Sequence, residues 1–396
     1  MSEPPVSTDH GRFKIRQRTP VSARALPAQL PPGLVKYLET AHAALAEPFK
    51  GVTADGLVVP DLFAIAKTGV STQPIHDAAR AWLASLGDEQ RGRATFPLES
   101  DAWRRWSNIH PFLLRHGVSL DEMHPAQRAR ALALLEASVS AAGYRTARDV
   151  MRLNEFVRGL TGSHDEYGEW LYWVSVMGAP SADGPWGWQL DGHHLIVNCF
   201  VLGDQVVMTP MFMGSEPVVA DGLRVFEAEE RQGLALMRAL TAEQRARAIL
   251  GPTLPNEAFT AAFRDNFELR YEGLRYGDLS TSQQELLLAL LGVYVGRVRP
   301  GHAEVRMEEV RRHLPDTHFA WMGGVDEASV FYYRIHSPVV LVEFDHQRGI
   351  ALDSDEPSRD HIHTVVRTPN GNDYGRDLLR RHHELFDHAR AGHDHR

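Results

Sequence analysis

Hydrophobic residues recur at helical spacing through the first part of the chain. Residues 34–46 and 72–86 show this pattern, and two longer segments, 124–143 and 144–162, follow it. Each of these longer segments ends at a glycine, and the first has a proline near its start, as helix termini favour. We therefore predict a helical region over residues 34–165.

The pattern changes after Gly168, where β-branched and aromatic residues become frequent. Residues 169–178 and 186–214 predict a strand, a loop and then a hairpin that turns at Gly203-Asp204. Helical spacing returns further on, for example at 256–266, and 374–389 predicts a closing helix.

The predicted fold class is α+β, with a helical N-terminal part packed on a mixed, mainly antiparallel sheet that carries the histidine clusters. The expected parts are an irregular arm (1–33), one domain (34–390) that is helical at 34–165, 222–296 and 374–390 and sheet-rich at 168–220 and 304–368, and a histidine-containing tail (391–396). The sequence has no βαβ series, GxGxxG motif or P-loop, so a nucleotide-binding fold is not predicted.

A predicted strand at 361–367 contains His361-Ile-His363. Side chains alternate along a strand, so His361, His363, Val365 and Arg367 should share one face. Two imidazoles on one face form half of a transition-metal site, and a guanidinium beside them suits an anion. The alternative is that these histidines only bond backbone groups at a strand edge.

A second histidine pair, His193-His194, follows Gly192. In a regular strand these two rings would point to opposite faces, so we expect one metal ligand unless a bulge re-aims the other. His194 is preferred because Asn198 would lie on its side of the strand. The alternative is one core histidine and one exposed histidine.

Other polar side chains could complete the site. Glu343 follows four apolar residues and is a candidate general base or ligand, although an ion pair with Arg334 explains it equally well. Arg334 is also a candidate, with Arg367, for binding a substrate anion. In the last predicted helix, His382 points toward the core of the protein and could be a further ligand.

Composition narrows the class of protein. The net charge of -9 argues against general nucleic-acid binding. The single cysteine, Cys199, lies in an apolar run and is expected to be inert core. The sequence has no apolar leader and no 18-residue apolar span, so we expect a cytoplasmic protein that does not cross a membrane.

Several segments together, among them WGWQLDGHHLIVNCFV, GDQVVMTPMFMGSEP and HIHTVVRTPNGNDYGRDLL, carry a resemblance. Over roughly residues 75–390 the chain resembles a bacterial family of uncharacterised proteins known as domain of unknown function 3500. The resemblance implies that these segments lie in one domain. It implies export for many members and no particular activity.

The functional expectation is a metal-dependent enzyme that acts on a small, anionic molecule. His193 or His194 would join His361 and His363 to hold zinc, iron or copper, and hydrolysis by a metal-activated water is favoured. The alternatives are a non-heme iron or copper oxygenase or oxidase at the same site, and a non-enzymatic metal- or ligand-binding protein. A homo-oligomer is compatible with the sequence.

Overall fold

The computed structural model describes residues 11–391, with side chains to 385, so the start of the predicted arm and residues 392–396 of the predicted tail lie outside it. The helices are α1 (Pro32–Ala46), α2 (Gln73–Ser85), α3 (Asp88–Ala94), α4 (Pro125–Ser138), α5 (Ala141–Thr161), α6 (Glu227–Ala239), α7 (Ala242–Ala248), α8 (Thr281–Val295), α9 (His302–Arg312) and α10 (Arg376–Ala391). The strands are β1 (Thr95–Phe96), β2 (Val118–Ser119), β3 (Tyr172–Met177), β4 (Pro185–Gly192), β5 (Leu195–Leu202), β6 (Gln205–Val207), β7 (Met211–Ser215), β8 (Val219–Ala220), β9 (Leu223–Arg224), β10 (Ile249–Gly251), β11 (Leu274–Arg275), β12 (His318–Gly323), β13 (Phe331–His336), β14 (Leu341–Arg348) and β15 (Pro357–Arg367).

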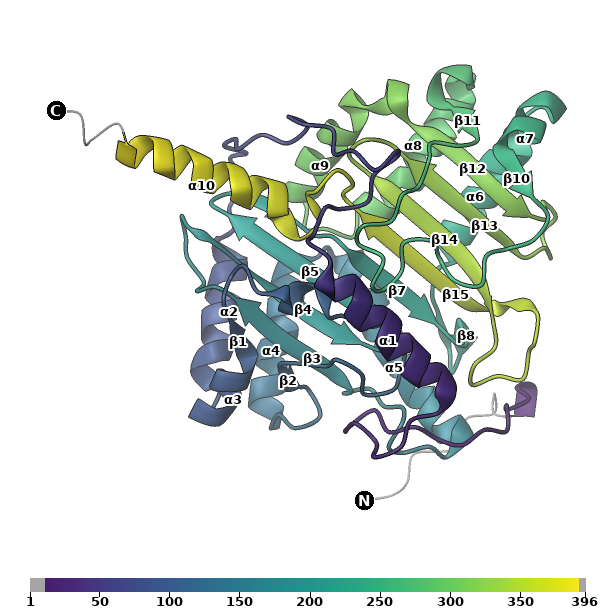
Figure 1. Ribbon diagram of the computed structural model, residues 1–396. Helices are drawn as coiled ribbons and strands as arrows, with labels where there is room; N and C mark the ends of the chain where they lie inside the picture. Colours follow the sequence, from purple (N-terminus) through teal and green to yellow (C-terminus); the bar gives the residue numbers. More distant parts are fainter. Residues whose placement is uncertain (1–10, 392–396) are drawn as a thin grey trace.

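One large sheet organises the described residues (Figure 1). Its main path is β1-β3-β4-β5-β7-β15-β14-β13-β12-β10, with β2, β6 and β11 paired beside it. The pairs β1·β3 and β10·β12 are parallel, and the central strands from β3 to β13 pair antiparallel. The predicted α+β fold with a mixed, mainly antiparallel sheet is therefore confirmed.

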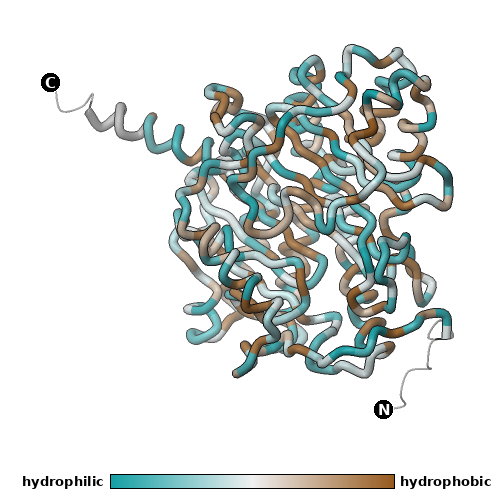
Figure 2. The backbone as a smooth tube through the Cα atoms, turned by 45° about the vertical axis from the view of Figure 1, so that its right-hand side comes forward, coloured by the Kyte–Doolittle hydropathy of each residue, from teal (hydrophilic) through white to brown (hydrophobic). Residues whose placement is uncertain are grey.

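The two faces of the sheet are covered differently. Buried residues of α2, α4, α5, α6 and α8 pack with strand residues such as Val366 in the largest core cluster. On the opposite face, Ile196, Phe212 and Val365 pack with residues of loops and of the start of α10. In Figure 1, α1 crosses this second face on the near side, and Figure 2 shows hydrophobic and hydrophilic stretches interspersed along the backbone. The face covered by loops holds the candidate site.

Residues 256–266 differ from the prediction, because they form no helix. Backbone groups that a helix would use internally are bonded elsewhere. The N–H groups of Phe259 and Thr260 donate to Glu343, and the carbonyls of Thr260 and Ala261 accept from Arg367. These long-range bonds hold the segment against the sheet as an irregular cover.

Two other boundaries also differ. The helix predicted over 124–143 ends at Ser138, and α5 begins at Ala141 with Ser140 as its N-cap. Gly143 lies inside α5, where a β-carbon would approach the backbone oxygen of Arg297 to 2.4 Å, so this glycine permits close packing rather than ending a helix. The second sheet-rich region begins at His318, after α9, rather than at residue 304.

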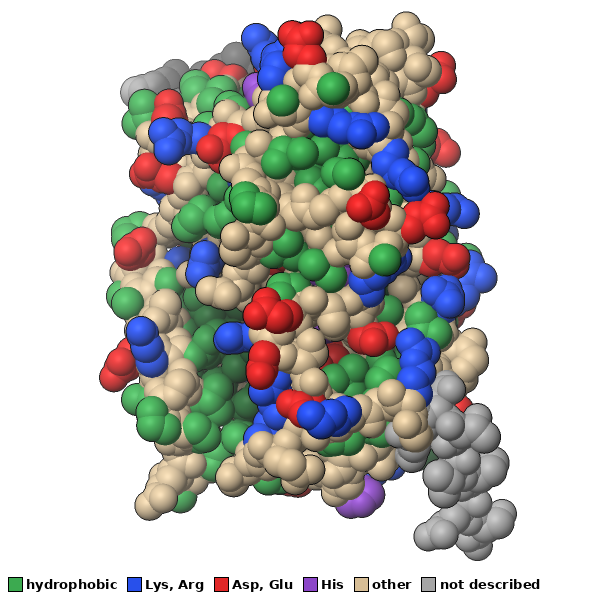
Figure 3. Space-filling model, turned by 90° about the vertical axis from the view of Figure 1, so that its right-hand side faces the viewer, with side chains coloured by type: hydrophobic (Ala, Val, Ile, Leu, Met, Phe, Trp, Pro, Cys, Tyr) green, Lys and Arg blue, Asp and Glu red, His purple; other side chains and the backbone are tan. Residues whose placement is uncertain are grey.

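No helix of the described residues combines the length and apolar character needed to cross a membrane. Cys199 is fully buried, in agreement with a core role. On the surface shown in Figure 3, acidic and basic side chains are interspersed around a recess with a hydrophobic floor.

Candidate metal centre

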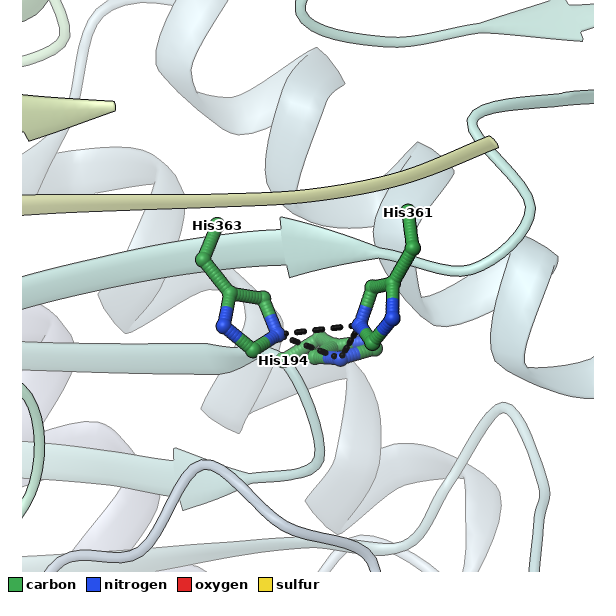
Figure 4. Close-up of side chains that lie close together, drawn as sticks. All are labelled: His194, His361 and His363. Carbon is green, nitrogen blue, oxygen red and sulfur yellow. Dashed lines mark hydrogen bonds between the residues drawn. The ribbon is translucent and has the colours of Figure 1, made fainter. Parts of the chain in front are cut away.

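Three buried histidines bring their Nε2 atoms to one point. The Nε2 atom of His361 lies 3.1 Å from that of His194 and 3.0 Å from that of His363, and the remaining His194–His363 separation is 3.1 Å (Figure 4). Nitrogen ligands about 2.0–2.1 Å from a tetrahedral zinc ion are separated by about 3.3 Å. The triangle is therefore close to the size that three imidazole ligands of one ion require. Within the described part of the chain, these are the residues that form a group able to hold a metal.

His194 reaches this point from a turn. His193 and His194 connect β4 to β5, where Gly192 pairs directly with Leu195, so the expected regular strand does not continue through the histidine pair. The φ of His194 is 60°, a left-handed conformation that is uncommon for a residue with a side chain. Its N–H donates to the Asn108 carbonyl, and its own carbonyl accepts from the Gly214 N–H. These bonds hold the backbone that directs the ring.

Gly214 makes room between the two parts of the triangle. It lies on β7, opposite His363 of β15. A β-carbon at this position would lie 2.8 Å from Cδ2 of His363 and 3.2 Å from Cδ2 of His194. A side chain here would push the two rings apart. Because glycine has none, the turn that carries His194 and the strand that carries His363 can bring their imidazoles together.

The outer nitrogens of two rings fix where their protons lie. His361 Nδ1 is 2.7 Å from the Arg348 carbonyl oxygen, which can only accept. His363 Nδ1 is 2.8 Å from Glu257 Oε1. Burial opposes the charge of Glu257, but His363 beside it, together with hydrogen bonds, keeps the pKa of this carboxyl below its usual value. Both Nδ1 atoms are thus donors, as is usual for histidines that bind metals.

It follows that the Nε2 atoms of His361 and His363 present lone pairs to each other across 3.0 Å. Two lone pairs at this distance repel unless a positive charge lies between them, and His194 can bring at most one proton to the triangle. Burial lowers the pKa of both His194 and His361, and neighbouring imidazoles lower it further, so the neutral forms that bind metals are favoured. The donor set fits a metal cation.

His193 lies next to the triangle without joining it. Its ring stacks on that of His194, with centroids 3.9 Å apart, and its Nδ1 is 2.8 Å from Asn154 Oδ1. Since the Asn154 amide nitrogen donates to the Gly168 carbonyl, its oxygen faces His193. Of the two histidines in the pair, His194 is the one that reaches His361 and His363.

Glu343 has partners other than the histidines. It lies on β14 opposite Arg334, and its carboxylate accepts from the backbone N–H groups of Phe259 and Thr260 and from the Tyr332 hydroxyl. It also bonds the Thr260 hydroxyl. These bonds occupy both oxygens, so Glu343 ties the irregular segment to the sheet rather than facing the triangle.

The two arginines expected to bind an anion are also engaged. Arg367 is fully buried between Asp265 and Asp373, at 2.8 and 2.9 Å, and donates to two backbone carbonyls. Arg334 pairs with Glu272 at 2.8 Å. Because these guanidinium groups balance carboxylates of the chain, neither offers a free cation at the site.

His382 lies on α10, which projects from the body of the molecule in Figure 1, and the histidine group does not include it. Trp186 and Trp188, upstream of the histidine turn, are buried in the core. Glu257 is the residue that sequence reasoning missed. It lies in an irregular segment, and no periodic pattern marks it.

A family model described as "Protein of unknown function (DUF3500)" matches residues 68–376, well over half of the chain. The search of curated proteins and the search of solved structures each returned no match.

Proposed function

Because the chain belongs to this family of proteins of unknown function, DUF3500, we propose its activity from its own residues: a metal-dependent hydrolase whose ion is bound by His194, His361 and His363. The observation that carries the proposal is the convergence of three Nε2 atoms within 3.1 Å of one another. The fixed lone pairs of His361 and His363 give it independent support.

The ligand types favour zinc, with copper as the second choice. All three donors are imidazole nitrogens, which suit both metals, whereas a two-histidine, one-carboxylate site is typical of non-heme iron. Glu343, the carboxylate considered for that role, is held by the segment around Thr260. Iron is therefore the least favoured of the three metals.

Three protein ligands leave a position for water or substrate, as in catalytic zinc sites. When bound in such a site, zinc lowers the pKa of a coordinated water to about 7 and so supplies a nucleophile for hydrolysis. A closed storage site would need a fourth protein ligand, and the group found among the described residues has three. This count favours an enzyme over a metal-storage protein.

The chain's own residues would orient the ligands and control access. Glu257 and the Arg348 carbonyl hold the rings of His363 and His361 from outside the triangle. The Glu257 side chain is 30 % exposed, whereas that of His363 is 6 % exposed, so solvent reaches this carboxylate more readily than the ligand behind it. With Arg334 and Arg367 engaged, a negative charge on the substrate has the metal as its expected partner.

A copper-dependent oxidase is the second candidate, because an all-nitrogen site also suits copper. Metal content separates the two candidates. Zinc in the protein as purified would support the hydrolase. Copper with a visible absorption band would instead support the oxidase.

The test is elemental analysis of untagged protein that has never contacted a metal-chelating resin. Wild type is compared with His361→Ala/His363→Ala and with a matched control, His382→Ala/His383→Ala, which removes two adjacent histidines from α10. We expect about one metal equivalent in wild type and control, and a loss of at least tenfold in the first variant. Equal metal content in all three proteins would refute the site.

Activity is then measured on chromogenic esters, amides, lactones and phosphoesters. The expected result is turnover by wild type and control that is lost on chelation and restored by zinc. Metal bound stoichiometrically without turnover of any substrate class would favour the binding protein instead.

A further inference from the structure

A cavity of about 200 Å³ lies away from the histidine triangle, between the sheet and α8–α9. Its apolar wall includes Met208, Met211, Val295, Val305 and Val366. A space of this size between well-packed elements is unusual, because protein interiors are normally close-packed. The apolar wall is suited to the hydrocarbon part of a small ligand.

The two strand residues Val366 and Met211, which line this cavity, face away from the metal centre. Their neighbours Val365 and Phe212 belong to the cluster on the face that carries the histidines. Side chains alternate between faces along a strand. Phe63 and Leu378 of the cluster on the histidine face also line the cavity, but His194, His361 and His363 do not, so the cavity is distinct from the histidine triangle.

Charged side chains of α9 form one edge of the cavity. Arg306 pairs with Glu309 and donates to the Val339 carbonyl. Arg312 is exposed at the mouth of the cavity and also lines it, and no ion pair or hydrogen bond to its guanidinium is found among the described residues. Two arginines and one glutamate leave a net charge of +1 at this edge, which matches a single negative charge on a ligand.

A buried imidazole lacks a partner in the same wall. His302 is 4 % exposed, and its Nε2 has no hydrogen-bond partner. The ring bonds the backbone of Ser71, and burial holds its pKa below the usual value. A buried polar atom without a partner destabilises the fold, because it loses its hydrogen bonds to water and gains none in return. A ligand hydroxyl in the cavity would remove this destabilisation.

We propose that this cavity binds a small amphipathic carboxylic acid. Its apolar body would lie against the methionine and valine wall, its carboxylate would pair with Arg312, and a hydroxyl on the body would donate to His302. The proposal does not depend on the metal centre.

The test uses decanoate, 1-decanol and a hydroxydecanoate as probes in isothermal titration with the full chain. We expect saturable binding of decanoate at one site and at least tenfold weaker binding of 1-decanol. Arg312→Ala should weaken decanoate binding about tenfold, whereas Arg311→Ala, the neighbouring exposed arginine outside the cavity, should change it less than twofold. Hydroxydecanoate should bind to wild type more tightly than decanoate does. The two acids should bind to His302→Phe with equal affinity.

Val305→Phe fills the cavity from α9 and should abolish binding while circular dichroism shows an intact fold. The His361→Ala/His363→Ala variant should bind decanoate like wild type, which separates this site from the metal centre. Absence of saturable binding would overturn the proposal, as would equal weakening by Arg312→Ala and Arg311→Ala.

Discussion

Glu257 accepts a hydrogen bond from His363 Nδ1 at 2.8 Å, on the side of the ring that faces away from the histidine triangle. The carboxylate fixes the tautomer of the ring and makes Nε2 a better donor to a metal. Residues in this relationship commonly change metal affinity strongly although they never touch the ion.

Glu257→Gln should therefore weaken zinc binding by about 10- to 100-fold. Competition with a fluorescent chelator measures the affinity, and Glu268→Gln, at a largely exposed carboxylate, serves as the control. Equal zinc affinity in wild type and Glu257→Gln would show that this hydrogen bond does not orient a ligand.

Gly214→Ala tests the space between turn and strand. The added methyl group would lie 2.8 Å from His363 Cδ2, closer than carbon atoms approach, so the rings must move. We expect loss of most of the bound metal with the sheet retained. The control is Gly292→Ala in α8, where no heavy atom lies within 4 Å of the added carbon. A fully loaded Gly214→Ala protein would contradict the triangle described above.

Arg367→Met tests whether this arginine is structural. The substitution leaves Asp373 buried without its cation, while Asp265 keeps Arg104 at 3.0 Å. Removing one partner of a buried ion pair typically costs about 3–5 kcal/mol of unfolding free energy. Urea denaturation followed by tryptophan fluorescence measures the loss, with the exposed Arg231→Met as control. If the variant were as stable as wild type but bound substrate more weakly, Arg367 would bind the substrate anion rather than stabilise the fold.

Glu166 predicts a pH dependence of stability. Burial disfavours its charge, but hydrogen bonds from His110 and Arg18 outweigh this and lower its pKa from 4.5 to about 2. A carboxyl with a depressed folded-state pKa stabilises the protein above its unfolded pKa, and this stabilisation is lost as pH falls from about 4.5 toward about 2.

Between pH 7 and pH 4 the Glu166 contribution should shrink by about 1 kcal/mol. The destabilisation caused by Glu166→Gln should therefore be smaller at pH 4 than at pH 7 in urea titrations. A destabilisation that is equal at both pH values would mean that the ionised carboxylate contributes nothing.

The strand that carries two ligands could be predicted from the sequence, because side-chain alternation alone places His361 and His363 on one face. The structure favours His194 over its neighbour for a different reason from the one that the sequence suggests. Asn198, the residue used to choose it, bonds Gln189 and the Pro210 carbonyl. What directs His194 is a left-handed turn conformation, and a sequence of two adjacent histidines does not reveal it.

The covering segment could not be predicted in the same way. Residues 256–266 carry apolar residues at a spacing that favours a helix, but Glu343 and Arg367 take up their backbone groups from strands 83 to 107 positions away. Such bonds depend on the assembled sheet. The position of Glu257 depends on these bonds, so local sequence patterns do not predict that it is the partner of His363.

His194 and His361 lie 167 positions apart, and β15 joins them only when it inserts between β7 and β14. A ribosome-bound chain that has not yet released β15 presents a single imidazole of this set, too few to retain an ion. Any ion should therefore bind only after β15 has emerged and paired with β7. A bound ion would link the turn between β4 and β5 to β15, two parts of the polypeptide that are distant in sequence, so its removal should weaken the contact between them at the centre of the sheet.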